Sequence, residues 1–156
     1  MYPEFSKFGV LQSQEETAVA AKPYLLALDG DEEVLKAIAK VVAPHFTAMV
    51  TRDPRKLLGW MENLKEVAVV MTEHVLQTAS GVALLETART MRPGARRVLL
   101  TSYHELSSIV AGLHSGAIER LVAKPFTVAE LLFGILPEGA AAGESGLGDA
   151  ARKRAG

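Results

Sequence analysis

The chain has 156 residues, of which 49% are hydrophobic and 22% charged, and it has no cysteine. This composition excludes global disorder, a disulfide scaffold and any cysteine-ligated zinc or iron–sulfur site. The 17 basic and 18 acidic residues leave a formal net charge of −1, which argues against a dedicated nucleic-acid-binding protein. No apolar run approaches the roughly 20 residues of a membrane span. The start of the chain also lacks the pattern of a secretory signal, so we expect a cytoplasmic protein.

Composition divides the chain into three parts. Residues 1–22 mix polar and apolar residues without a steady period, and we interpret them as an N-terminal extension. Residues 137–156 contain five glycines and six alanines. Because such a tail has little large apolar surface to bury, we expect it to be disordered. The stretch 23–136 remains as the folded domain.

Within 23–136, short apolar runs rich in Val, Leu or Ile alternate with segments of helical periodicity. The runs are typical of strands that are buried on both faces. They span 24–28, 46–51, 67–72, 98–101 and 120–123. This βα order, repeated five times, predicts a parallel sheet with helices on both faces.

The segments between the runs carry apolar stripes at helical spacing, and two of them have start signals. Asp53 before Pro54 predicts an N-cap with proline at the first helical position. Thr127 followed by Glu130 predicts a capping box. The five stripes are Val34, Leu35, Ile38, Val41 and Val42; Leu57, Leu58 and Met61; Val82, Leu84, Leu85 and Ala88; Leu106, Ile109, Val110 and Leu113; and Val128, Leu131, Leu132 and Ile135.

Polar residues follow four of the five predicted strands. In open parallel sheets the functional crevice lies at the carboxyl ends of the strands, so these residues are the candidates for a site. In chain order they are Asp29, Gly30 and Asp31; Glu73; Thr101 and Ser102; and Lys124.

These residues carry a resemblance. Region 23–136 resembles the response-regulator receiver domain of two-component signalling, through the stretches Arg-Val-Leu-Leu-Thr-Ser-Tyr at 97–103, Ser-Gly-Ala-Ile at 115–118 and Leu-Val-Ala-Lys-Pro-Phe at 121–126. Gly81 also lies where receivers place a glycine. The resemblance implies a flavodoxin-like α/β fold with a five-stranded parallel sheet in the order 2-1-3-4-5.

The resemblance also implies roles for the strand-end residues. In a typical receiver two adjacent acids after the first strand hold Mg²⁺, and an Asp after the third strand accepts a phosphoryl group. A Thr or Ser after the fourth strand and a Lys after the fifth contact that group. Thr101, Ser102 and Lys124 match these contact positions. A cation and fixed donors there neutralise the charge on the phosphoryl oxygens.

This sequence departs from the family pattern at four positions, one of which is Gln77, where the family has a proline four residues after the acceptor. The acid pair maps onto Asp29 and Gly30, with Asp31 one place late and expected to cap the first helix. Glu73 stands at the acceptor position and Leu121 at the position of the switch aromatic. The carboxylate of Glu lies one methylene, roughly 1.5 Å, farther out than that of Asp, and in-line transfer is sensitive to about 1 Å.

We therefore interpret the domain as a non-enzymatic pseudo-receiver. No cofactor or metal is expected, and the residual Asp29 would hold Mg²⁺ only weakly, because this ion prefers near-octahedral oxygen coordination. An ion pair between Glu73 and Lys124 would mimic part of the phosphorylated state. The alternative is that the site has drifted and has no remaining role.

A receiver-like domain of this kind predicts a protein partner. The expected surface comprises the fourth helix, fifth strand and fifth helix, over 105–136, and a second copy of the chain is the alternative partner there. Nucleic acid and membrane are not expected partners. Two alternatives stay open: a response regulator that still binds Mg²⁺ or accepts phosphoryl groups, and a haloacid-dehalogenase-like phosphatase using Asp29 and Asp31 of a DxD motif.

Overall fold

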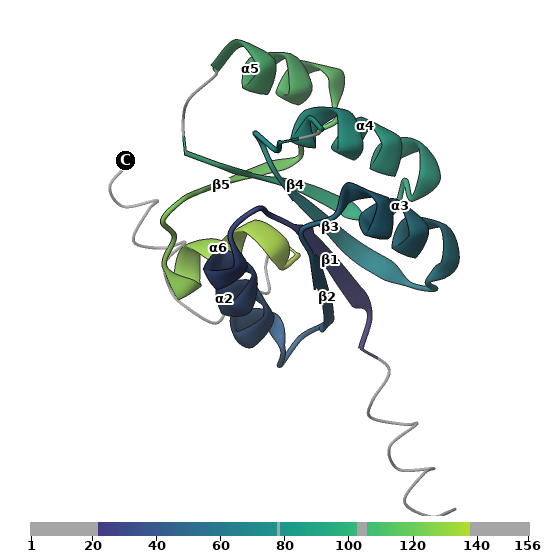
Figure 1. Cartoon of the computed structure of the whole chain (residues 1–156), viewed down its shortest axis with the longest axis vertical. Helices are drawn as coiled ribbons and strands as arrows, with labels where there is room; N and C mark the ends of the chain where they lie inside the picture. Colours follow the sequence, from purple (N-terminus) through teal and green to yellow (C-terminus); the bar gives the residue numbers. More distant parts are fainter. Residues whose placement is uncertain (1–21, 78, 103–105, 138–156) are drawn as a thin grey trace, which may run out of the picture.

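The computed structural model describes residues 22–77, 79–102 and 106–137. The predicted extension and tail therefore lie outside the described residues, except for Lys22 and Pro137. The described chain alternates strands and helices (Figure 1). The elements are β1 (Tyr24–Leu28), α2 (Glu32–Val42), β2 (Thr47–Thr51), α3 (Pro54–Asn63), β3 (Val67–Glu73), α4 (Gly81–Met91), β4 (Arg96–Thr101), α5 (Leu106–Ser115), β5 (Arg120–Ala123) and α6 (Val128–Ile135).

The five strands form one parallel sheet in the order β2-β1-β3-β4-β5. This is the predicted flavodoxin-like arrangement, and the prediction is confirmed. Helices α2 and α6 cover one face of the sheet, and α3, α4 and α5 cover the other (Figure 1). Because crossovers are right-handed and the step from β1 to β2 runs opposite to the later steps across the sheet, α2 lies on the other face from α3, α4 and α5.

Alternation along β1 shows why both layers are needed. Leu25 and Ala27 pack in the cluster that contains the buried residues of α2 and α6. Leu26 and Leu28 pack in the other cluster, with residues of α3, α4 and α5. All four side chains are wholly buried. Because successive strand side chains point to opposite faces, an unbroken apolar run is stable only between two helical layers.

The predicted helix starts are confirmed. The Asp53 side chain accepts from the Arg55 N–H, with Pro54 in the first turn of α3. Thr127 and Glu130 form the reciprocal capping box of α6. Each of these caps satisfies backbone donors that an isolated helix end leaves without partners.

The structure adds two details to the apolar pattern. Not every stripe residue is buried: Val110 and Leu113 of α5, and Val128 of α6, are 48%, 42% and 57% exposed. Strand β4 begins at Arg96, two residues before the predicted run. Arg97 extends the strand because its buried guanidinium donates to the carbonyls of Ala117 and Gly116.

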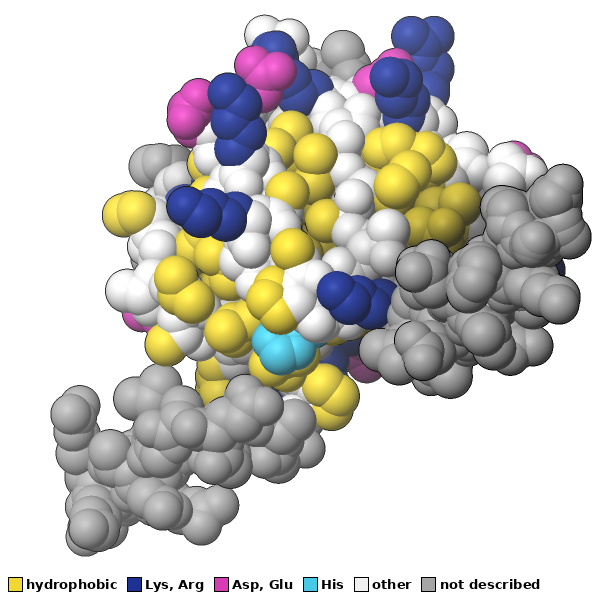
Figure 2. All heavy atoms as spheres, turned by 90° about the horizontal axis from the view of Figure 1, so that it is seen from below, with side chains coloured by type: hydrophobic (Ala, Val, Ile, Leu, Met, Phe, Trp, Pro, Cys, Tyr) yellow, Lys and Arg dark blue, Asp and Glu magenta, His cyan; other side chains and the backbone are white. Residues whose placement is uncertain are grey.

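Hydrophobic side chains also reach the surface on the side of α2 and α6, among charged ones (Figure 2). None of the helices in the described ranges is long and apolar enough to cross a membrane.

Candidate functional site

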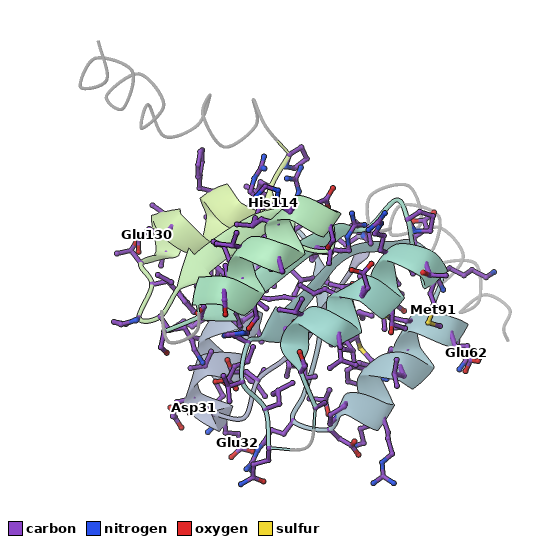
Figure 3. All side chains as sticks on the ribbon, turned by 90° about the horizontal axis from the view of Figure 1, so that it is seen from above. Asp31, Glu32, Glu62, Met91, His114 and Glu130 are labelled. Atoms are coloured by element: carbon purple, nitrogen blue, oxygen red, sulfur yellow. The ribbon has the colours of Figure 1, made fainter. Side chains whose placement is uncertain are left out.

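Sheet register brings the polar strand ends to one edge of the molecule. Leu28 pairs with Thr72, Glu73 with Leu100, and Thr101 with Ala123. Because the strands are parallel and in this register, the residues that end β1, β3, β4 and β5 emerge side by side. Asp31 lies at this edge, and His114, in the last turn of α5, lies at the opposite one (Figure 3).

Lys124 lies between two carboxylates at this edge. Its Nζ is 2.7 Å from Oε2 of Glu73 and 3.0 Å from Oδ2 of Asp29. The Asp29 side chain is completely buried, and the side chains of Lys124 and Glu73 are 13% and 22% exposed. The ion pair that the sequence led us to expect between Glu73 and Lys124 is present, and Asp29 is a second partner of the same ammonium group.

The remaining carboxylate oxygens are held by backbone amides. Oδ1 of Asp29 accepts from the Asp31 N–H at 2.8 Å, and Oε1 of Glu73 accepts from the Gly30 N–H at 2.9 Å. All four carboxylate oxygens of the pair therefore have a protein donor. Charge-assisted hydrogen bonds of this kind are among the stronger ones in proteins, so the cluster is a tightly connected unit.

The three charged groups change one another's pKa. Burial raises the pKa of Asp29 above its usual value, although the Asp31 N–H and Lys124 act against that shift. Burial also acts to raise the pKa of Glu73, but Lys124 and the Gly30 N–H outweigh it and hold this pKa below its usual value. Burial alone would lower the pKa of Lys124, whereas its contacts with Glu73 and Asp29 raise it. Glu73 and Lys124 are therefore stabilised in their charged forms.

Thr101 and Ser102 border a small cavity beside this cluster. The cavity, of about 90 Å³, is also lined by Glu73, His74 and Lys124. Thr101 is buried and its carbonyl accepts from the Lys124 N–H at 2.8 Å, whereas Ser102 is exposed. This backbone hydrogen bond between the ends of β4 and β5 fixes the position from which the Lys124 side chain extends.

The side chains at two other predicted positions lie outside the cluster. Asp31 is the N-cap of α2, where its Oδ1 accepts from the Glu33 N–H at 2.9 Å, as expected from its place in the sequence. Leu121 lies on β5 with 41% of its surface exposed. Asp31 therefore acts on the helix start and is not among the groups that contact Lys124.

Three features of the site were not predicted from the sequence. The Asp29–Lys124 contact joins residues 95 positions apart. The Gly30 N–H, a donor that any non-proline residue would offer, holds Glu73. Gly81, at the start of α4, lies so close to β3 that an added Cβ would be 1.8 Å from the Glu73 carbonyl oxygen. The sequence signals for them were the strand-end positions of Asp29 and Lys124, which place both at one edge, and the glycine at position 81.

Among the described residues, no group of three or more His, Asp or Glu side chains is arranged to hold a metal ion. The positive group that faces the two carboxylates is the Lys124 ammonium.

Comparisons with known proteins agree with this fold. No family model matches the chain. Photosynthetic apparatus regulatory protein RegA of Rhodovulum sulfidophilum is 25% identical over 129 residues, which cover 83% of this chain and 70% of that protein. RegA of Cereibacter sphaeroides is 28% identical over 115 residues, which cover 74% of this chain and 62% of that protein. The match to this second relative thus spans less than two thirds of its length.

Solved structures are similar over the same region. The signal receiver domain of an HD domain-containing protein from Pseudomonas fluorescens is 28% identical, with a TM-score of 0.66, and the match covers 72% of this chain and 90% of that one. A CheY-like response regulator receiver domain from Methanospirillum hungatei, 23% identical, has the same TM-score and coverage. The chain has the fold of response-regulator receiver domains, and its relatives support a receiver-domain role in signal transduction.

Proposed function

We propose that this chain is a pseudo-receiver: a non-enzymatic signalling domain that binds a protein partner without being phosphorylated. The observation that carries the proposal is the position of Lys124, whose Nζ contacts both Glu73 and Asp29. In the family it resembles, the equivalent Lys contacts the phosphoryl group. Here a permanent carboxylate is its partner, so the charge pairing does not require phosphorylation.

The donor set supports the absence of a Mg²⁺ site. This ion needs near-octahedral oxygen ligands, but the position of the second acid is Gly30 and the Asp29 and Glu73 oxygens all accept from protein donors. A cation in this place would have to compete with the Lys124 ammonium for both carboxylates. The residues present therefore do not fit a bound Mg²⁺.

Exposed apolar side chains on the last three elements support a protein partner there. Val110 and Leu113 on α5, Leu121 on β5, and Val128 and Phe133 on α6 are all at least 41% exposed. Exposed apolar groups that gather on a few elements are typical of a protein interaction surface. We define the partner surface as residues 106–136. The predicted region began at residue 105, which lies outside the described residues.

Intact mass after incubation with acetyl phosphate and Mg²⁺ tests the first half of the proposal. We expect the mass of the wild type to be unchanged, as for Glu73→Ala treated in parallel. The 90 Å³ cavity beside Thr101 and Lys124 favours one competing function, a receiver that still accepts phosphoryl groups. A stoichiometric adduct on the wild type, absent from Glu73→Ala, would establish that function and end the pseudo-receiver proposal.

Affinity capture from the native cell tests the second half. We expect Leu121→Asp and Phe133→Asp to lose partners, or copies of this chain, that the wild type captures. Both side chains are exposed, so neither change should affect folding. Ala83→Asp, at another exposed apolar residue but on α4 and outside this surface, is the matched control. Equal capture by the wild type, the two surface variants and the control would rule the surface out. Glu73→Ala is captured in parallel, and a change in its partners would show that the partner depends on the charge cluster.

A phosphatase function has less support, because Asp31 caps α2 and does not contact Lys124. Mg²⁺-dependent hydrolysis of p-nitrophenyl phosphate, lost in Asp29→Asn, would favour it over the pseudo-receiver.

A further inference from the structure

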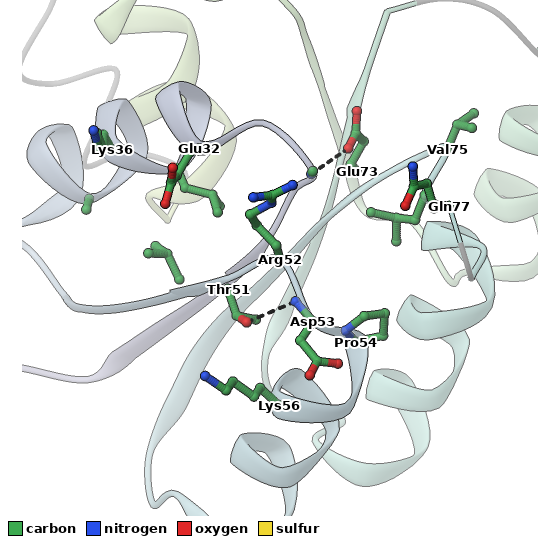
Figure 4. Close-up of a pocket in the computed structure, with 15 residues that line it drawn as sticks. Glu32, Lys36, Thr51, Arg52, Asp53, Pro54, Lys56, Glu73, Val75 and Gln77 are labelled. Carbon is green, nitrogen blue, oxygen red and sulfur yellow. Dashed lines mark hydrogen bonds between the residues drawn. The ribbon is translucent and has the colours of Figure 1, made fainter.

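An open groove lies beside the charge cluster, at the carboxyl ends of β1, β2 and β3 (Figure 4). Its volume is about 870 Å³, which falls within the range of roughly 300–1,000 Å³ of small-molecule pockets. The first turns of α2 and α3 and the segment after β3 line it. In a sheet of order 2-1-3-4-5, the connections leave β1 and β3 in opposite directions across the sheet, and such a switch point is where open α/β sheets bind ligands.

Basic side chains line this groove. Arg52 extends from the end of β2 into the open space, whereas Lys36 on α2 and Lys56 on α3 lie along its walls (Figure 4). Within the described parts of the chain, no carboxylate or other side-chain partner contacts Arg52 or Lys56. Lys36 reaches only the exposed Glu33, at 3.5 Å. Guanidinium and ammonium groups so placed are suited to phosphate or carboxylate.

Most of the acidic groups around the groove are already paired. Asp53 accepts from the Arg55 N–H and lies 3.6 Å from its guanidinium. Glu73 is held by Gly30 and Lys124. Glu32 is the one lining carboxylate without a partner in the described residues, against two unpaired cations. The local balance of unpaired charge is therefore positive, although the chain as a whole is slightly acidic.

Apolar side chains form the rest of the lining. Leu35, Val50, Leu76 and Val75 lie along the same groove, and Val75 is 60% exposed. An amphiphilic ligand would fit such a lining. The apolar body of the ligand would bury the apolar wall, and its anionic group would contact the unpaired cations.

We propose that this groove binds a small organic anion, in which a phosphate, carboxylate or sulfonate group is carried on an apolar body. Arg52 takes the anionic group, Lys56 adds positive charge from the wall, and Val75 and Val50 contact the body. This site is separate from the pseudo-receiver proposal, because it requires neither a protein partner nor the absence of phosphorylation.

The probe is 1-anilinonaphthalene-8-sulfonate, an aromatic sulfonate, added to the whole chain and followed by amide shifts in ¹H–¹⁵N spectra and by fluorescence. We expect saturable binding with the largest shifts at Gly30, Arg52 and Val75. Arg52→Gln with Lys56→Gln should weaken binding about tenfold, which corresponds to about 1.4 kcal/mol. Val75→Ser should weaken it about threefold. Inorganic phosphate should compete only weakly, because it lacks the apolar body.

The matched control is Lys40→Gln with Lys65→Gln, the same charge change on exposed lysines that do not line the groove. It should alter the affinity less than twofold. Unfolding curves check that every variant folds, as expected for exposed positions. Shifts confined to α5, β5 and α6, affinity unchanged by the Arg52 and Lys56 changes, or equal loss in the control would each overturn the proposal.

Discussion

Glu73 and Gly30 are joined by a hydrogen bond from the Gly30 N–H to Oε1 of Glu73, at 2.9 Å. The other oxygen of the same carboxylate contacts Lys124. Glu73 thus ties the loop after β1 to the end of β5 across β3. The side chain of Glu reaches both partners at once, and this bridge connects the two loops through protein groups alone.

Lys124→Met should destabilise the fold by about 2–4 kcal/mol at pH 7. The change leaves two adjacent carboxylates, one of them completely buried, without a counter-charge. The control is Lys40→Met, at an exposed position without this role, for which we expect about 0.5 kcal/mol or less. Urea unfolding measures both, and equal effects would mean that the cluster contributes no stability.

The same Lys124→Met protein should become more stable as the pH falls from 7 towards 5. Without the ammonium, each carboxylate raises the pKa of the other, so the folded state takes up a proton before the unfolded state does. Stability then rises with acid until the pH reaches the unfolded pKa values of about 4. Urea midpoints at several pH values measure this trend, and a flat profile would show that the two carboxylates do not interact.

Glu73→Gln should be less stable than the wild type at pH 7, and this difference in unfolding free energy should become smaller as the pH falls. The pKa of Glu73 is lowered in the folded state, so its contribution is present above the unfolded pKa of about 4.3 and is lost as the pH falls through the folded pKa. We expect a loss of about 1–2 kcal/mol at pH 7. Unfolding free energies measured between pH 7 and pH 3 should show this loss becoming smaller. A difference that stays constant with pH would mean that the charge of Glu73 does not contribute to stability.

Gly81→Ala should destabilise the chain by about 1–3 kcal/mol, because the added Cβ would collide with the Glu73 carbonyl oxygen and force β3 or α4 to move. Gly59→Ala is the matched control inside α3, where an added Cβ meets nothing within 4 Å. There we expect a gain of about 0.5–1 kcal/mol from helix propensity. Thermal unfolding compares the two, and a neutral Gly81→Ala would show that the close approach to β3 is not required.

Phosphorylation should return only when both missing carboxylate features are restored. Glu73→Asp alone should give no adduct with acetyl phosphate and Mg²⁺, because the second metal ligand is still missing at Gly30. Gly30→Asp with Glu73→Asp should give a measurable adduct by intact mass. The backbone has room for it, since a Cβ at Gly30 meets the Glu73 side chain at an ordinary 3.5 Å. An adduct on the single variant would show that the acid pair is not the limiting feature.

The sequence by itself determined the order of elements, the two-sided burial of the strands and the helix starts. These are local properties: apolar runs, helical spacing and caps such as Asp53 and Thr127 depend on residues a few positions apart. Local pattern failed where burial depends on a distant partner. Val110 lies on the apolar stripe of α5 but is 48% exposed in the described part of the chain, and Arg97 enters β4 because carbonyls of another loop accept its donors.

Only the tertiary structure decided how the site is connected. Strand-end logic placed Asp29, Glu73 and Lys124 at one edge, and the resemblance suggested a pair between Glu73 and Lys124. It did not show that Lys124 also contacts Asp29, or that the Gly30 N–H holds Glu73. Such contacts depend on sheet register and side-chain reach over 95 and 43 positions of sequence. The groove lined by Arg52, Lys56 and Val75 also became visible only when three separate strand ends met at one edge.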